Sequence, residues 1–110
     1  MNDLTSDTRK VIERLFPAQR DEVCDLLTRE CGDNLPLTGP RSAASSHERI
    51  RFAVLKISNG DVTKLRDAVE HAKIDWRDVL MGAGFGDSLT AHKEWARAVL
   101  NEPLSHPRHP

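Results

Sequence analysis

The chain has 110 residues, of which 38% are hydrophobic and 30% are charged, and its formal net charge is −1. This length and composition predict a single soluble globular domain, and a nearly neutral chain has no long-range attraction for nucleic acid or for an anionic membrane surface. No apolar run approaches the roughly 20 residues of a membrane span, and the opening MNDLTSDTRK lacks the apolar core of a signal peptide. We therefore expect a cytoplasmic protein that does not enter membranes.

Apolar residues recur at three- and four-residue steps near the N-terminus, a spacing that predicts two amphipathic helices. The first is SDTRKVIERLF, which places Val11, Ile12 and Leu15 on one face. The second is PAQRDEVCDLLTREC, in which Pro17 suits the first turn of a helix. Gly32 follows this segment and provides a C-terminal stop.

The two cysteines, Cys24 and Cys31, both fall on the second of these helices. Seven helical positions separate their Cα atoms by roughly 10.5 Å, whereas a disulfide needs less than about 7 Å. We expect both thiols to be reduced, which favours the cytosol. Their expected role is that of small apolar core residues, with a catalytic nucleophile as the less favoured alternative.

Residues 32–46, GDNLPLTGPRSAASS, are rich in glycine, proline and serine, and they predict a loop. A connection this long is unusual in a compact domain and is often functional. One alternative hypothesis for the chain is therefore a small enzyme with a pocket near this loop.

The stretch SSHERIRFAVLKIS is apolar over most of its circumference between Ile50 and Ile57. A buried strand has a similar pattern, but Ser45 and Glu48 match the S-x-x-E capping box of a helix. The apolar side chains also keep helical spacing, so we expect a central helix packed by several neighbours. This helix has more apolar faces than we expect a small monomer to cover, which favours a homo-oligomer.

Turn and cap residues divide the rest of the chain into three further helices. Gly60 ends the central helix, and Asp61 has the side chain of an N-cap for the next one, VTKLRDAVEHAK. Asp75, another cap residue, restarts the chain as DWRDVLMGA, and DSLTAHKEWARAVL forms the last helix. We expect one domain over residues 1–102 and a proline-rich flexible tail over residues 103–110.

Three glycines, Gly82, Gly84 and Gly86, crowd the segment LMGAGFGD and raise the question of a phosphate-binding loop. A dinucleotide fingerprint needs the spacing G-x-G-x-x-G between a strand and a helix. Here the spacing is G-x-G-x-G, and a helix precedes it. We interpret the segment as the end of one helix and the start of the next, with Phe85 folded back onto the core.

Other motifs of catalytic or ligand-binding sites are also incomplete. The segment HERIR resembles the zinc motif H-E-x-x-H, but Arg51 stands where the second histidine would be. The histidines are scattered, and no G-x-S-x-G nucleophile motif is present. We therefore expect no cofactor, no metal ion and no catalytic residue.

Positive charge gathers locally in residues 41–56, which contain Arg41, Arg49, Arg51 and Lys56 against one acidic residue. We interpret these side chains as the solvated flank of a helix. The alternative is a contact surface for nucleic acid or for a partner. Trp95 lies beside the apolar stripe of the last helix and is interpreted as a core-edge residue, with an exposed partner contact as the alternative.

The segment ERIRFAVLKISNGDVTKLRDAVEHAKIDWRDVLMGAGFG, from Glu48 to Gly86, resembles a family of short uncharacterised bacterial proteins with no assigned activity. The resemblance extends back to RDEVCDLLTRECGDNLP. It implies a small bacterial cytosolic protein. It contains no catalytic or ligand-binding motif and assigns no role to any residue.

The sequence thus predicts a single compact all-α bundle of five to six short helices around the central apolar helix. We expect a non-catalytic regulatory or protein–protein interaction protein that also self-associates. The alternatives are a helical nucleic-acid-binding protein that uses residues 41–56 and a small enzyme with a pocket near residues 32–46.

Overall fold

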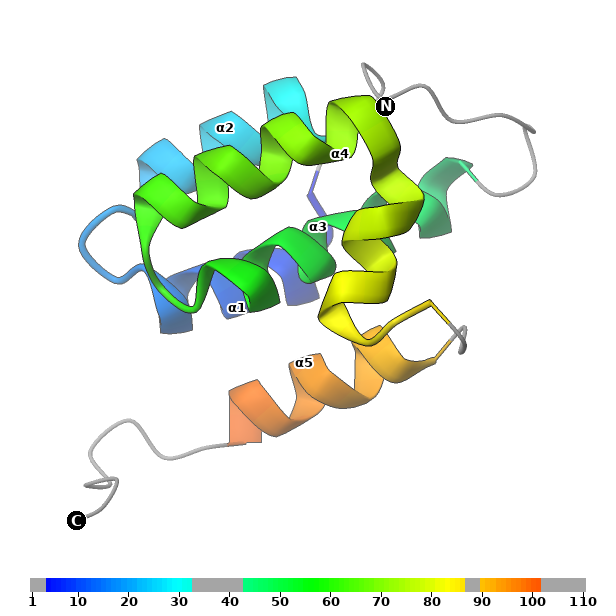
Figure 1. Cartoon of the computed structure of the whole chain (residues 1–110). Helices are drawn as coiled ribbons and strands as arrows, with labels where there is room; N and C mark the ends of the chain where they lie inside the picture. The colour runs from blue at the N-terminus through cyan, green and yellow to red at the C-terminus, as the bar shows by residue number, and fades with distance from the viewer. Residues whose placement is uncertain (1–3, 33–42, 87–89, 102–110) are drawn as a thin grey trace, which may run out of the picture.

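α-Helices make up most of the part of the chain that the computed structural model describes, which comprises residues 4–32, 43–86 and 90–101 (Figure 1). They are α1 (Ser6–Leu15), α2 (Arg20–Glu30), α3 (Ala43–Ser58), α4 (Val62–Ala83) and α5 (Ala91–Asn101). No strand occurs within these described ranges. The predicted all-α bundle is therefore confirmed, and the apolar stretch of α3 is helical rather than extended.

Helix α3 is the centre of the bundle. It contacts α1, α4 and α5, while α2 packs on α1 and α4 (Figure 1). Its side chains Ile50, Phe52, Val54 and Leu55 are at most 1% exposed, and among the large apolar side chains described in α3 only Ile57, at 38%, is exposed. The monomer thus covers most of the apolar side chains described in its central helix, and the homo-oligomer stays a prediction.

Two predicted boundaries are wrong by a few residues. Helix α3 already begins at Ala43, so Ser45 lies within the helix and not at its N-cap. The two alanines that open α3 have the highest helix propensity, which explains the extension into the segment predicted as loop. Residues 33–42 of that segment lie outside the described ranges. Helix α2 begins at Arg20, which leaves Pro17 in the turn after α1.

Helix α4 is bent at Asp75, as the cap chemistry of that residue predicts. The backbone of Asp75 leaves the helical region, with φ −151° and ψ 85°. Its carboxylate accepts a hydrogen bond of 3.2 Å from the Asp78 N–H, which caps the second arm of the helix. The bend turns the second arm of α4 away from α2 and toward α5 (Figure 1).

The glycine-rich segment ends α4, as predicted. Gly84 adopts a left-handed conformation with φ +83°, and the Phe85 N–H donates to the Leu80 carbonyl at 2.9 Å. This pattern is a common helix C-terminus in which glycine avoids the steric cost of a Cβ. Phe85 then folds back and is 1% exposed. The segment therefore acts as a helix stop that returns an aromatic side chain to the core.

Ion pairs add a polar link between α2 and α4. Lys73 Nζ lies 2.5 Å from Glu30 Oε1, and Arg66 Nη2 lies 2.6 Å from Glu22 Oε2. The Lys73 ammonium lowers the pKa of the Glu30 carboxyl below its usual value. Among the described residues, no helix is both long and apolar enough to cross a bilayer.

Candidate functional site

Two basic residues of α3, Arg49 and Lys56, bind the C-terminal end of α4. Arg49 Nη2 donates to the Phe85 carbonyl at 2.5 Å and to the Gly86 carbonyl at 3.5 Å. Lys56 Nζ donates to the Ala83 carbonyl at 2.8 Å and lies 5.1 Å from the centre of the Phe85 ring. Cations are favourable at a helix C-terminus because carbonyl groups there lack partners within the helix and carry partial negative charge.

Arg51 binds the end of a different helix. Its side chain is only 2% exposed, and Nε donates to the Cys31 carbonyl, immediately after α2, at 2.8 Å. The interpretation of Arg51 as a solvated flank residue is therefore wrong, and its buried side chain has no surface to offer to nucleic acid. Arg51 lies on the buried face of α3, next to the end of α2. Arg41 lies outside the described residues.

Trp95 lies at the edge of an aromatic cluster, as the core-edge interpretation predicts. Its ring is half-buried and lies 6.0 Å from Phe52 and 6.1 Å from Phe85, both in tilted or edge-on orientations. Such geometries are favourable for aromatic pairs. The cluster joins α3, the end of α4 and α5 into one packed unit.

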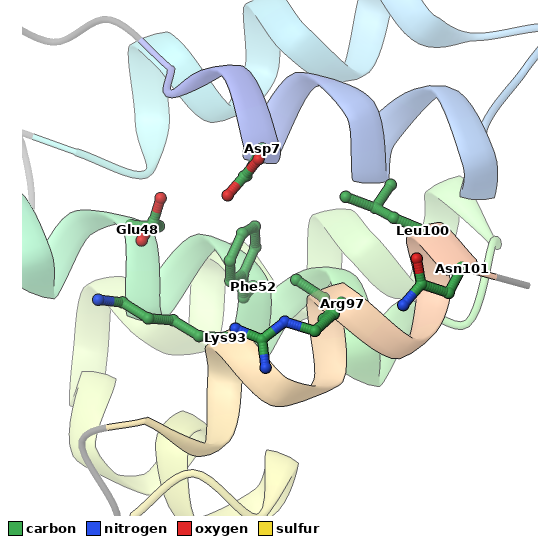
Figure 2. Close-up of a pocket in the computed structure, with 8 residues that line it drawn as sticks. Asp7, Glu48, Phe52, Lys93, Arg97, Leu100 and Asn101 are labelled. Carbon is green, nitrogen blue, oxygen red and sulfur yellow. The ribbon is translucent and has the colours of Figure 1, made fainter.

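A charged cleft opens between α1, α3 and α5 (Figure 2). Its volume is about 430 Å³, and its lining residues are Asp7, Glu48, Phe52, Lys93, Ala96, Arg97, Leu100 and Asn101. In Figure 2 the carboxylates of Asp7 and Glu48 lie above the Phe52 ring, and the Lys93 and Arg97 side chains lie below it. Cations and anions thus stand on opposite walls of one cleft.

The Glu48 carboxylate is held from the α1 side. Its Oε2 accepts a 2.8 Å hydrogen bond from the Thr5 hydroxyl, and its side chain is only 18% exposed. The other oxygen, Oε1, lies 3.8 Å from His92 Nε2, beyond hydrogen-bond distance. Thr5 is also the N-cap of α1 and accepts from the Thr8 N–H at 3.1 Å. One cap residue therefore positions both a helix and a carboxylate of the cleft.

His92 is a buried imidazole behind this carboxylate. It is 2% exposed, and neither ring nitrogen has a hydrogen-bond partner in the part of the chain that the structure describes. Burial lowers the pKa of His92, Glu48 opposes the shift, and the charges of Arg49 and Lys93 reinforce it. The sequence did not predict that His92 and Glu48 lie close together, because they are far apart along the chain.

A second, more apolar groove lies at the bend of α4. It has a volume of about 250 Å³, and it is lined by Ile57, Lys64, Asp67, Ala68, His71 and Val79. His71 on the first arm and Asp78 on the second approach to 2.9 Å between Nε2 and Oδ2, a contact that spans the bend. Ile57, Ala68 and Val79 make the floor of the groove apolar, and the charged side chains lie at its rim.

Neither cysteine has the surroundings of a reactive thiol. Burial raises the pKa of Cys31 to about 12, and it also raises the pKa of the half-buried Cys24. A raised pKa reduces the thiolate fraction, which is the nucleophilic form. Within the described ranges, no group of three or more histidine, cysteine or acidic side chains is arranged to hold a metal ion.

Comparison of the chain with protein-family models, with curated proteins and with solved structures returned no match. The resemblance to a family of short bacterial proteins therefore stays a prediction.

Proposed function

We propose that the chain is a non-catalytic protein-interaction protein that binds a helical segment of a partner at the bend of α4. The observation that supports this proposal most strongly is the placement of exposed apolar side chains. The large hydrophobic residues exposed in the described part are Ile57 at 38%, Ile74 at 84% and Met81 at 63%. All of them belong to the end of α3 or to α4, and Ile57 also lines the groove at the bend.

The groove at the bend has the chemistry of a receptor for an amphipathic helix. Ile57, Ala68 and Val79 provide an apolar floor, while Lys64 and Asp67 provide charges of both signs at its rim. An amphipathic helix binds such a surface through apolar side chains on one face, with its polar face in solvent. Burial of Ile74 and Met81 by a partner would remove apolar surface from water, which favours association by about 25 cal/mol per Å².

The alternative of nucleic-acid binding has less support. Arg49, Arg51 and Lys56 donate to backbone carbonyls at the ends of α2 and α4, and the net charge of −1 does not favour counterion-driven binding. The hypothesis of an enzyme pocket near residues 32–46 depends on a segment that lies largely outside the described ranges.

Site-specific cross-linking tests the interaction proposal. A photo-reactive benzoylphenylalanine is placed at Ile74 or at Met81 in the full chain, and at Arg29 on α2 as a matched exposed control. We expect a discrete adduct in the producing cell from the α4 positions and none from Arg29. Adding the substitutions Ile57→Glu or Met81→Glu to the chain labelled at Ile74 should abolish that adduct. Equal adducts from Arg29, or none from either α4 position, would refute the proposal.

Sedimentation velocity of the purified chain identifies the partner as a second copy or as another protein. If the partner is a second copy, the sedimentation coefficient rises with concentration, and the Ile74→Glu and Met81→Glu variants remain monomeric. If the partner is another protein, the chain is monomeric at all concentrations and the adduct contains a different mass. Self-association that survives both substitutions would contradict the assignment to α4.

A further inference from the structure

The cleft between α1, α3 and α5 contains four charged groups that do not pair with one another. Asp7 on α1 and Glu48 on α3 face Lys93 and Arg97 on α5 (Figure 2). Among the described residues, no salt bridge joins either carboxylate to either cation. Charges of opposite sign on the two walls of a cleft therefore remain available for a ligand.

The cations of α5 lie in a mutually unfavourable arrangement. Lys93 and Arg97 are four residues apart, which places them on the same face of the helix. Like charges at this spacing repel each other, so an anionic group placed between them would stabilise both. Both side chains are exposed, and both line the cleft. This wall is therefore suited to a carboxylate.

The opposite wall is suited to an ammonium group. Oε1 of Glu48 accepts no hydrogen bond in the described part of the chain, although the Glu48 side chain is only 18% exposed. His92 Nε2 lies 3.8 Å from this oxygen, and His92 is 2% exposed with no hydrogen-bond partner at either nitrogen in the described part of the chain. This carboxylate oxygen therefore has no donor from the described part of the chain and remains able to accept hydrogen bonds from a ligand. A ligand ammonium, with three N–H donors, would satisfy it.

The floor and the size of the cleft fit the apolar body of a small molecule. Leu100 on α5 is half-buried and offers apolar surface at the cleft, whereas Phe52 and Ala96, which also line it, are almost fully buried (Figure 2). The volume of about 430 Å³ falls within the range of roughly 300–1,000 Å³ typical of ligand pockets. A compound that carries both charges at the ends of a short apolar body matches these features together.

We infer that this cleft binds a small zwitterion with an apolar body, such as a free aliphatic amino acid. Its ammonium group pairs with Glu48 and Asp7, its carboxylate pairs with Lys93 and Arg97, and its hydrocarbon part lies against Leu100. The inference goes beyond the proposed protein interaction, because it uses different residues and a different class of ligand. Failure of one does not decide the other.

Titration calorimetry with defined probes tests the charge requirement. The zwitterionic probes are L-leucine and 6-aminohexanoate, which differ in the separation of their charges. The analogues of L-leucine are 4-methylpentanoate, without the ammonium group, and 3-methylbutylammonium, without the carboxylate. We expect at least one zwitterion to bind and each single-charge analogue to bind at least about tenfold more weakly, since each charge-assisted contact contributes that much or more. Equal binding of the carboxylate analogue, or no binding of either zwitterion, would overturn the inference.

Substitutions locate the binding to the cleft. Glu48→Gln keeps an oxygen that accepts from Thr5, and Arg97→Gln removes one cation. Each should weaken the zwitterion at least about tenfold. Arg29→Gln, an exposed arginine on α2, serves as the control and should leave the affinity unchanged. Circular dichroism confirms that each variant is folded, and Asp7→Asn replaces Glu48→Gln if the latter unfolds. Unchanged affinity in the folded cleft variants would place the ligand elsewhere and refute the assignment.

Discussion

The glycines of the LMGAGFGD segment offer a test in which neighbouring substitutions have opposite effects. Gly84 has φ +83°, a left-handed conformation that an L side chain rarely adopts. Gly82 is helical, and an added Cβ would meet only Ile57 Cδ1, at 3.8 Å, which is ordinary van der Waals contact. Changing either glycine to alanine adds the same methyl group. Only the backbone conformation distinguishes the two positions.

The magnitudes follow from these conformations. Gly84→Ala should destabilise the fold by about 1–2 kcal/mol, the cost of placing an L residue in the left-handed helical region. Space is not the cause, because the nearest atom to the added Cβ is Lys56 Nζ at 3.7 Å. Gly82→Ala should stabilise the fold by about 0.5–1 kcal/mol, because alanine replaces glycine inside a helix. The two variants should thus differ in unfolding free energy by about 1.5–3 kcal/mol.

Urea unfolding followed by circular dichroism at 222 nm measures both changes, with equal m-values as the condition for comparing them. If Gly84→Ala is as stable as the wild type, the helix does not end in the left-handed conformation described. If Gly82→Ala is destabilised as strongly as Gly84→Ala, both glycines are required for the fold, and the left-handed conformation of Gly84 alone does not explain the segment.

Further predictions concern buried polar groups. Arg51→Met should lower the unfolding free energy by about 1–3 kcal/mol in urea unfolding, because the buried Cys31 carbonyl loses its charged donor; Arg29→Met, which removes a surface ion pair, should cost less than about 0.5 kcal/mol. Stability measured between pH 7.5 and pH 5 should fall as the pH drops below about 6.5, because the pKa of His92 is lowered in the folded state and the unfolded chain therefore binds more protons in that range. The substitution His92→Leu should reduce this slope. Ellman's reagent should modify the half-buried Cys24 first and Cys31 only on unfolding, since burial raises the pKa of Cys31 to about 12.

Each of these predictions has a result that contradicts it. Equal losses in Arg51→Met and Arg29→Met would show that the buried hydrogen bond contributes nothing beyond a surface pair. An unchanged pH slope in His92→Leu would assign the acid sensitivity to other groups. Modification of Cys31 at the rate of Cys24 under native conditions would contradict the burial of its thiol.

Local sequence determined the helices and most of their ends. Leu65, Val69 and Ala72 have the three- and four-residue spacing of one helix face, and all are fully buried. The cap at Asp75 and the stop at Gly84 were also predicted, because caps and left-handed turns depend on interactions within about four residues of the chain. Where prediction failed at helix starts, as at Ala43, intrinsic propensity extended the helix past a recognisable cap motif.

Only the tertiary structure decided what the charged residues do. Arg51 had the pattern of a surface residue, yet it donates to a carbonyl twenty positions away, at the end of another helix. The same holds for Arg14, which donates to the Leu100 carbonyl in α5. A long cationic side chain pairs with whichever acceptor the packing of helices brings within reach, and amino-acid spacing does not contain that information.

The cleft is a tertiary feature for the same reason. Asp7, Glu48 and Arg97 come from three helices that are separated along the chain and meet at the cleft only in the folded protein. Hydrophobic periodicity therefore determined which surfaces are buried, since burial of an amphipathic face depends on the repeat of the helix itself. Which charged side chains lie close together depended on how those faces packed. Electrostatic interactions act through space, and they can therefore join residues that are far apart along the chain.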